Sequence, residues 1–209
     1  TTAIDPLKEI GVICQKHQIW LHVDAAYAGT ALMLPEFRFM SEGMEFADSF
    51  VFNPHKWLFT NFDCSVYFVR EKEFLIRTFE IIPEYLKTRH EKSVNDYSNW
   101  GIQLGRRFRA LKLWFVLRTF GQQGLRERIR EHIRLGKLFY DLVLNDERFE
   151  LMAPLSLNLI CFRYNPNKNK ELEYINELNE KLLEKINESG KLFLSHTKIK
   201  NKYILRFIC

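Results

Sequence analysis

Residues 49–57 read Ser-Phe-Val-Phe-Asn-Pro-His-Lys-Trp, an apolar run that passes directly into a polar segment with a proline. The first five of these residues predict a short strand. Upstream, residues 18–23 (Gln-Ile-Trp-Leu-His-Val) predict a buried strand that ends at Asp24. Asp5 and Pro6 come before it and predict a helix start, because a capping side chain followed by proline is common there. A helix followed by a strand is half of an α/β repeat, so the sequence predicts an α/β fold.

The rest of the chain predicts a third strand, a long loop, two helical stretches and a small α+β unit. The strand is expected over residues 64–69, and the loop over residues 79–103, which show no sustained period. Helical patterns follow from residue 105 and, after Gly121 and Gly124, up to about residue 145. The first of these stretches is expected to carry Phe108, Leu111 and Phe115 on one face. The last four strands are expected over residues 148–152, 157–164, 192–194 and 203–207, with an amphipathic helix closed by Gly190 between the second and third.

The composition excludes several classes of protein. The chain has 209 residues, a formal charge of +5 and 46% hydrophobic residues, which is too apolar for a disordered tail. No apolar run approaches the roughly 20 residues that cross a bilayer, and no signal peptide is expected at the start. The four cysteines are far apart in sequence and form no C-x-x-C pair. A zinc site or a disulfide framework is therefore not expected, and a reducing cytosol fits best.

Arginine-rich stretches at residues 106–109 and 126–134 allow two interpretations. The first is a nucleic-acid surface. The second is a set of helix faces on which the interleaved Glu127 and Glu131 form local ion pairs. We favour the second interpretation because no recognisable nucleic-acid module surrounds the arginines. Isolated histidines without the spacing of metal ligands are His90, His132 and His196.

Two residues with reactive side chains are predicted at strand ends. Asp24 ends one strand and is followed by small residues that let a flat ligand approach the backbone; the alternative is that it caps a turn or a helix. Lys56 follows another strand and lies between His55 and Trp57. We expect this lysine to be desolvated and therefore more reactive toward carbonyl groups. In open α/β sheets, ligands bind beyond the carboxyl ends of the strands, where both residues are expected.

A carboxylate and an amine in these places are the pair that pyridoxal phosphate needs. The carboxylate lies beside the pyridinium nitrogen, and the lysine forms an imine at the aldehyde carbon. The carboxylate keeps the ring nitrogen protonated, so that the ring can accept the electrons left when a bond at the substrate α-carbon breaks. The sequence therefore predicts a pyridoxal phosphate site that contains Asp24 and Lys56.

Five motifs in order carry a resemblance to a known family. They are H-V-D-A-A-Y-A-G (22–29), A-D-S-F-x-F-N-P-H-K-W (47–57), N-F-D-C-S (61–65), P-E-Y-L-K (83–87) and L-G-R-R-F-R-x-L-K-x-W-F-V (104–116). Together they resemble the pyridoxal-phosphate-dependent aromatic L-amino-acid decarboxylases, which belong to the group II decarboxylases. The resemblance implies a type I, aspartate-aminotransferase-like fold. It also implies a homodimer with active sites at the dimer interface, while the spacing of the cysteines favours the cytoplasm.

The resemblance also implies how the chain is divided. Residues 1–112 would be the rear part of the large cofactor-binding domain, and residues 113–209 most of the small C-terminal α+β domain. The family residues that stack on the ring and complete the phosphate site are expected before Thr1, and the family sequence is expected to continue beyond Cys209. The 209 residues alone would then be inactive.

Cofactor-site roles follow from the resemblance position by position. Lys56 matches the lysine that forms the imine with pyridoxal phosphate, and Asp24 matches the aspartate that pairs with the pyridine nitrogen. Ala26 matches the small residue packed against one face of the ring. Asn53 and His55 match residues near the cofactor phosphate.

Tyr85 matches the tyrosine of a catalytic loop that protonates the carbanion after carbon dioxide leaves. Family members with phenylalanine there tend to be oxygen-consuming aldehyde synthases, so Tyr85 favours decarboxylation of an aromatic L-amino acid to its amine. An aldehyde synthase, an aminotransferase of the same fold and a non-catalytic relative or fragment acting only in assembly are the alternatives. The aminotransferase is disfavoured, because it would not normally carry N-P-H-K-W together with the Tyr85 loop.

Overall fold

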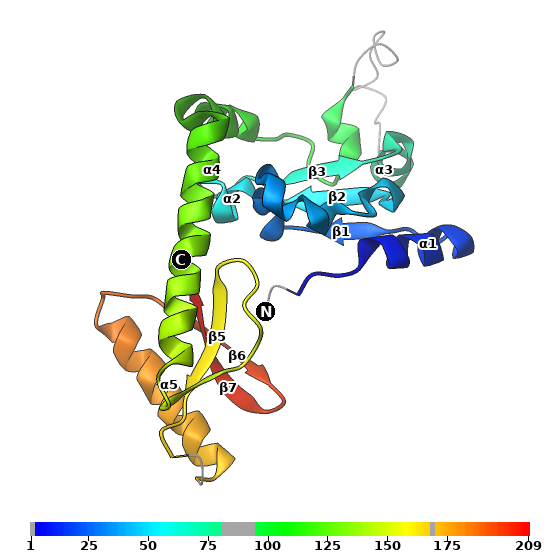
Figure 1. Ribbon diagram of the computed structural model, residues 1–209. Coiled ribbons are helices and arrows are strands. Elements are labelled where there is room, and N and C mark those ends of the chain that lie inside the picture. The colour runs from blue at the N-terminus through cyan, green and yellow to red at the C-terminus, as the bar shows by residue number, and fades with distance from the viewer. Residues whose placement is uncertain (1–2, 81–94, 168–169) are drawn as a thin grey trace. The chain divides into compact units, whose positions relative to one another are not determined.

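The structure is a computed structural model that describes residues 3–80, 95–167 and 170–209 (Figure 1). It contains two compact units, which are described separately below. One unit spans Pro6–Gln122, and the other combines the chain up to Asp5 with Gln123–Cys209. The sequence-based division after residue 112 concerns the domains of the whole family fold and stays a prediction.

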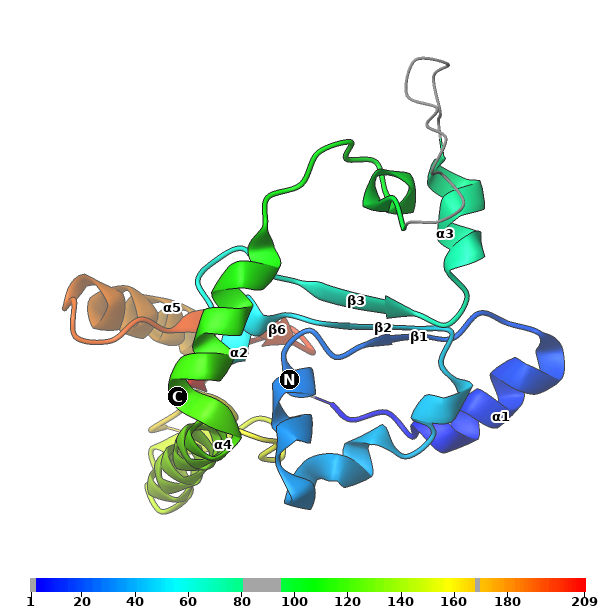
Figure 2. The same ribbon diagram turned by 90° about the horizontal axis from the view of Figure 1, so that it is seen from above.

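The first unit is built on a sheet of three strands in the order β1-β2-β3 (Figure 2). Strands β1 and β2 run parallel, with Asp24 opposite Val51. Strands β2 and β3 run antiparallel, with Phe52 opposite Val66. The strands are β1 (His22–Asp24), β2 (Ser49–Phe52) and β3 (Val66–Val69). The expected strands over 49–53 and 64–69 are therefore confirmed, and the second is two residues shorter than predicted.

Short helices surround this sheet. They are α1 (Leu7–His17), α2 (Pro54–Trp57) and α3 (Lys72–Phe79), with 3-10 turns η1 (Ala28–Met33), η2 (Pro35–Ser41), η3 (Met44–Phe46) and η5 (Tyr97–Trp100). Helix α1 packs closely on η3, because a Cβ atom added at Gly11 would lie 2.5 Å from the Cβ of Phe46. The predicted helix is confirmed, but its predicted cap is wrong. Pro6 occupies the N-cap position, and no side chain caps the helix.

The predicted buried strand over residues 18–23 is largely wrong. Gln18 adopts a left-handed conformation at the C-cap of α1, and the Ile19 N–H donates to the carbonyl of Cys14. Gln18 and Ile19 therefore end the helix, and the side chains of Ile19 and Trp20 are exposed. Strand β1 begins only at His22, and its side chains alternate between exposed and buried. The final residue of the prediction is correct, because the strand does end at Asp24.

The element α4 (Arg109–Leu144) consists of two helical stretches that meet at the break that the sequence predicted. Gly121 has φ 63° and ψ 175°, a combination that glycine reaches without the steric cost a Cβ would bring. The two helical stretches on either side of it are confirmed. Phe108 precedes the helix and therefore does not share a helical face with Leu111 and Phe115, which corrects the expected pattern.

The second unit contains a four-stranded antiparallel sheet in the order β4-β5-β7-β6. The elements are β4 (Phe149–Leu151), β5 (Leu159–Tyr164), α5 (Leu172–Glu188), β6 (Ser195–Ile199) and β7 (Lys202–Ile208). The predicted order strand–strand–helix–strand–strand is confirmed. The strand placed at 192–194 is wrong, because the hairpin is set by Lys200 and Asn201, whose φ angles are 49° and 63°. A two-residue turn of this kind pairs Ile199 with Lys202 and starts the strand at Ser195.

A buried hydrophobic cluster holds this second sheet together. Side chains from β5 and β7 pack with Leu183 of α5 and Val143 of α4. Asn179 lies within α5 and is fully buried, and its amide is satisfied by the backbone N–H and carbonyl of Tyr164. In the described parts of the chain, no helix has the length and apolar character that crossing a membrane requires.

An ion pair between the buried Arg163 and the half-buried Glu150 joins β4 to β5 in the same unit. The Arg163 side chain is 7% exposed, and its Nε donates to Glu150 Oε2 at 2.7 Å. Asn165 Nδ2 donates to the other carboxylate oxygen. Burial by itself would raise the pKa of Glu150, but these hydrogen bonds outweigh it and place the pKa below the usual value of 4.5. The charged form of Glu150 is therefore part of the folded sheet.

Removing this carboxylate should be costly, because it leaves the Arg163 charge buried without a partner. We expect Glu150→Ala to lower the free energy of unfolding of the full-length protein by about 3 kcal/mol, measured by urea unfolding. The matched control is Glu131→Ala, which removes the exposed pair with Arg134. That change should cost no more than about 0.5 kcal/mol. Equal effects of the two substitutions would contradict the role of Glu150 as the partner of the buried Arg163.

Candidate functional site

Parallel pairing of β1 and β2 brings two predicted site residues to one edge of the sheet. Asp24 is the last residue of β1, opposite Val51, one residue before the end of β2. The backbone pairing continues past both strands, since Ala25 N donates to Val51 O at 3.0 Å and Asn53 N donates to Ala26 O at 2.9 Å. Asp24, Ala26 and Asn53 are therefore held together by main-chain hydrogen bonds at the carboxyl ends of the strands.

Lys56 is placed beside this edge by the one-turn helix α2. The turn is closed by the Lys56 N–H, which donates to Asn53 O at 2.9 Å, and proline at its first position suits a helix start. Pro54 and Trp57 are the buried residues of the turn, and Trp57 stacks on Tyr27 with ring centroids 4.8 Å apart. Lys56 lies between these two anchors and is exposed. The expected desolvation of Lys56 is therefore wrong for this chain, because the turn buries its neighbours instead.

The reactive groups of Asp24 and Lys56 are both available. Asp24 Oδ1 accepts the N–H of Ala26 at 2.9 Å, so the turn-capping interpretation of Asp24 is also correct. Within the described residues, neither Asp24 Oδ2 nor Lys56 Nζ takes part in a hydrogen bond or an ion pair. One oxygen of Asp24 thus fixes the turn while the other can accept a proton-bearing nitrogen.

Small residues keep the segment after β1 close to β2. A Cβ atom added at Gly29 would lie 2.5 Å from the Cβ of Phe52, so only glycine allows this approach. Ala25, Ala26 and Ala28 occupy the same segment, and their side chains extend little beyond the backbone. The carboxylate, the amine and the small residues present here fit pyridoxal phosphate, which requires a carboxylate and an amine and tolerates only a small residue against its ring.

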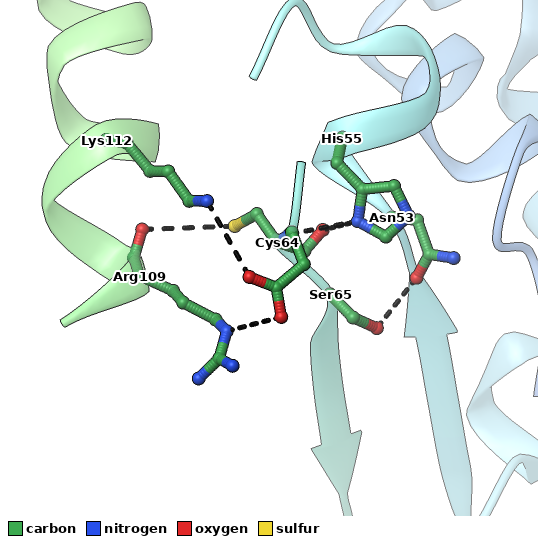
Figure 3. A network of polar contacts seen from close by, with 7 residues as sticks. Asn53, His55, Cys64, Ser65, Arg109 and Lys112 are labelled. Carbon is green, nitrogen blue, oxygen red and sulfur yellow. Dashed lines mark hydrogen bonds and ion pairs between the residues drawn. The ribbon is translucent and has the colours of Figure 1, made fainter. Parts of the chain in front are cut away.

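A second polar network lies on the β3 side of α2 (Figure 3). Ser65 Oγ donates to Asn53 Oδ1 at 2.7 Å. His55 Nδ1 lies 2.9 Å from the backbone N of Cys64 and 2.7 Å from its carbonyl oxygen. The Nδ1 edge of the imidazole is therefore occupied by the Cys64 backbone in either neutral tautomer.

Asp63 connects the same segment to the first turn of α4. Arg109 Nε donates to Asp63 Oδ2 at 2.9 Å, and Lys112 Nζ lies 3.9 Å from Oδ1 (Figure 3). The hydrogen bond from Arg109 is the largest cause that holds the pKa of Asp63 below its usual value of 3.8. Cys64 is buried beside this pair, and burial raises the pKa of its thiol. This cysteine is therefore a packing residue rather than a thiolate.

The sequence alone indicates no role for residues 63–65, and the structure shows how they contact the site. The position of Ser65 beside Asn53 could have been inferred from the pairing of the strands on which the two residues border. Phe52 pairs with Val66, so the residue that follows β2 lies next to the residue that precedes β3. The sequence indicates both strands but not that they run antiparallel, and only this direction brings Ser65 to Asn53.

Tyr85 lies outside the described residues.

The arginine-rich stretches contain the local pairing that the sequence favoured, for example Arg134 with Glu131. In the ranges that the structure describes, no group of three His, Cys, Asp or Glu side chains could hold a metal ion.

Comparison with known proteins agrees with this arrangement. The family model of the pyridoxal-dependent decarboxylase conserved domain matches residues 1–165. The chain belongs to the pyridoxal-dependent decarboxylase family.

Individual family members are similar over almost the whole chain. Aromatic-L-amino-acid decarboxylase of Cavia porcellus is 48% identical over 99% of this chain and 42% of that protein. Phenylacetaldehyde synthase of a Rosa hybrid cultivar is 46% identical over the same shares. The crystal structure of Oryza sativa TDC with PLP and tryptamine has a TM-score of 0.93 and 39% identity, covering 100% of this chain and 44% of that chain. The expected type I fold is thereby confirmed. The chain spans less than half the length of these decarboxylase relatives.

The Asp63–Arg109 pair should make stability depend on pH at the acid end. Because the pKa of Asp63 is lowered in the folded state, its contribution is fully present above 3.8 and is lost as the pH falls through the lower folded value. We expect Asp63→Asn to lower the urea midpoint of the full-length protein at pH 7, and the difference from wild type to shrink below about pH 4. A difference that stays constant down to pH 3 would contradict the ion pair.

Proposed function

We propose that the full-length protein decarboxylates an aromatic L-amino acid to its amine and carbon dioxide, with pyridoxal phosphate as cofactor. The observation that carries this proposal is the position of Asp24 and Lys56 after two paired parallel strands, each with a reactive group that no described residue engages. Membership of the pyridoxal-dependent decarboxylase family supports it. The aromatic substrate class is supported by the similarity to an aromatic-L-amino-acid decarboxylase.

Each cofactor-site residue has a distinct task in this proposal. Lys56 would hold the cofactor through its Nζ at the aldehyde carbon, the position at which the substrate amine is also expected to engage it. Asp24 Oδ2 holds a proton on the pyridine nitrogen, and its fixed Oδ1 keeps the carboxylate in place. Ala26 packs on one face of the ring. Asn53 and His55 hold the phosphate end of the cofactor. When bound, the cofactor supplies a conjugated ring that accepts the electron pair released with carbon dioxide.

Tyr85 completes the proposed set, although it lies outside the described residues. Its phenol delivers the proton that replaces the lost carboxylate at the substrate α-carbon. A phenol suits this task because it can donate and regain a proton near neutral pH when a neighbouring group assists. The tyrosine therefore determines that the product is an amine.

An aldehyde synthase is the second candidate, because the chain is also similar to a phenylacetaldehyde synthase. The identity is 46%, against 48% to an aromatic-L-amino-acid decarboxylase. The family-based role of Tyr85 favours the decarboxylase. A catalytically incomplete relative that acts only in assembly remains the alternative from another class of function.

We also propose that the protein acts as a homodimer in the cytoplasm. Exposed apolar side chains before α4 support an interface there, namely Ile102, Leu104 and Phe108. A surface pocket of about 390 Å³ adjoins them, lined by Arg107, Phe108, Arg109, Leu111, Lys112 and Phe115. The cytoplasmic location rests on the sequence alone, in which the four cysteines are far apart and form no C-x-x-C pair.

Lys56→Ala tests the cofactor assignment directly. We expect the full-length variant to lose the visible absorbance of cofactor bound to lysine and to release no amine, because no other group can form that bond. Lys72→Ala is the matched control, since Lys72 lies at the start of α3 and its Nζ donates to Asn95 Oδ1. It should keep both the absorbance and the activity. Absorbance that persists in Lys56→Ala would refute the assignment.

Tyr85→Phe tests the choice between the two enzyme candidates. Without the phenol, protonation at the α-carbon should fail, and we expect oxygen consumption with release of aldehyde and peroxide in place of amine. The measurement is product analysis on a panel of aromatic amino acids, with an oxygen electrode. Unchanged amine release by the variant would show that Tyr85 does not deliver the proton.

A further inference from the structure

The segment Asp63–Ser65, called here the 63–65 segment, contacts two of the proposed phosphate ligands. Antiparallel pairing of Phe52 with Val66 brings Ser65 next to Asn53, and Ser65 Oγ donates to Asn53 Oδ1 at 2.7 Å (Figure 3). His55 meets the same segment through the backbone of Cys64. Neither contact was expected from the sequence, and neither is used in the proposed reaction.

The hydrogen bond from Ser65 determines which end of the Asn53 amide can meet an anion. An asparagine amide has one acceptor oxygen and one nitrogen with two donor hydrogens. A phosphate oxygen accepts hydrogen bonds, so only the nitrogen end of the amide can bind it. Because Ser65 engages Oδ1, the rotamer seen here leaves Nδ2 as the end that can serve a phosphate group.

The same argument applies to His55. The Cys64 backbone occupies the Nδ1 edge of the ring, which leaves Nε2 as the nitrogen that can reach a ligand. Both proposed phosphate-binding residues are therefore hydrogen-bonded to consecutive residues of the 63–65 segment. Asp63 fixes the start of this segment to α4 through Arg109.

We propose that Ser65 is a positioning residue for the phosphate group of the cofactor, acting through Asn53. This inference rests on the proposed function, in which Asn53 holds that phosphate. In this proposal Ser65 acts through Asn53 and not through a contact of its own with the cofactor. Its hydroxyl selects the amide rotamer that donates, so its loss should weaken binding of the phosphate group and leave the contacts of the ring unchanged.

The test compares two ligands that differ only in the phosphate. Full-length apoenzyme is titrated with pyridoxal phosphate and with pyridoxal, and the ratio of the two dissociation constants is the readout. We expect Ser65→Ala to weaken pyridoxal phosphate about five-fold, the effect of one hydrogen bond, with pyridoxal unchanged. Ser65→Thr keeps a hydroxyl and should restore the wild-type ratio.

A double-mutant cycle separates positioning from a general loss of structure. If Ser65 acts through Asn53, adding Ser65→Ala to Asn53→Ala should leave the ratio where Asn53→Ala alone put it. Ser189→Ala is the matched control, because Ser189 Oγ donates to a backbone carbonyl in the second unit. It should not change the ratio in either background.

The possible outcomes distinguish this inference from the proposed function. If Asn53→Ala changes the ratio and Ser65→Ala does not, Asn53 binds the phosphate unaided and the inference is overturned while the function stands. Equal weakening of both ligands by Ser65→Ala would also overturn it. If Asn53→Ala leaves the ratio unchanged, the role given to Asn53 in the proposed function fails and the inference fails with it.

Discussion

The parallel pairing of β1 with β2 is the contact on which the rest of the site depends. It has only three residue pairs, but its backbone hydrogen bonds continue past both strands into Ala25 and Asn53. Every proposed cofactor residue in the described chain lies within a few positions of this pairing. Asp24 and Ala26 follow β1 directly, and Asn53, His55 and Lys56 follow β2. Slipping the register by one residue would separate the carboxylate from the amine and turn the strand side chains to the opposite face.

Both side-chain packing and main-chain hydrogen bonds hold this edge of the sheet in place. The small residues after β1 permit the close approach, and Trp57 anchors α2 by stacking on Tyr27. The polar groups on the β3 side of α2 come from the 63–65 segment, which an ion pair joins to α4. The reactive groups themselves remain exposed or half-buried within the described residues. The described chain therefore fixes the positions of the reactive side chains without enclosing them.

The sequence predicted features that depend on neighbouring residues and missed those that depend on partners far along the chain. Asp24 at a strand end, Lys56 after a strand and the break at Gly121 each have a local cause and were found. The start of β1 is an exception, because its cause is local: the left-handed cap at Gln18 ends α1 through bonds to the carbonyls of Cys14 and Gln15, and an apolar run does not indicate such a cap. The contact between Ser65 and Asn53 was missed because it requires the direction of β3, which apolar runs do not encode.

Cys64 has a consequence for how this region can vary among natural sequences. Its backbone, not its side chain, meets the imidazole of His55, while the thiol is packed out of contact with solvent. The side chain at this position therefore does not determine the hydrogen bonds of the histidine, while its burial and the contact of Sγ with the Arg109 carbonyl at 4.0 Å restrict it to small uncharged groups. Uncharged residues of similar size are therefore expected to replace one another at position 64 without disturbing His55. The same freedom does not extend to positions 53 and 65, where the hydrogen bond joins two side chains.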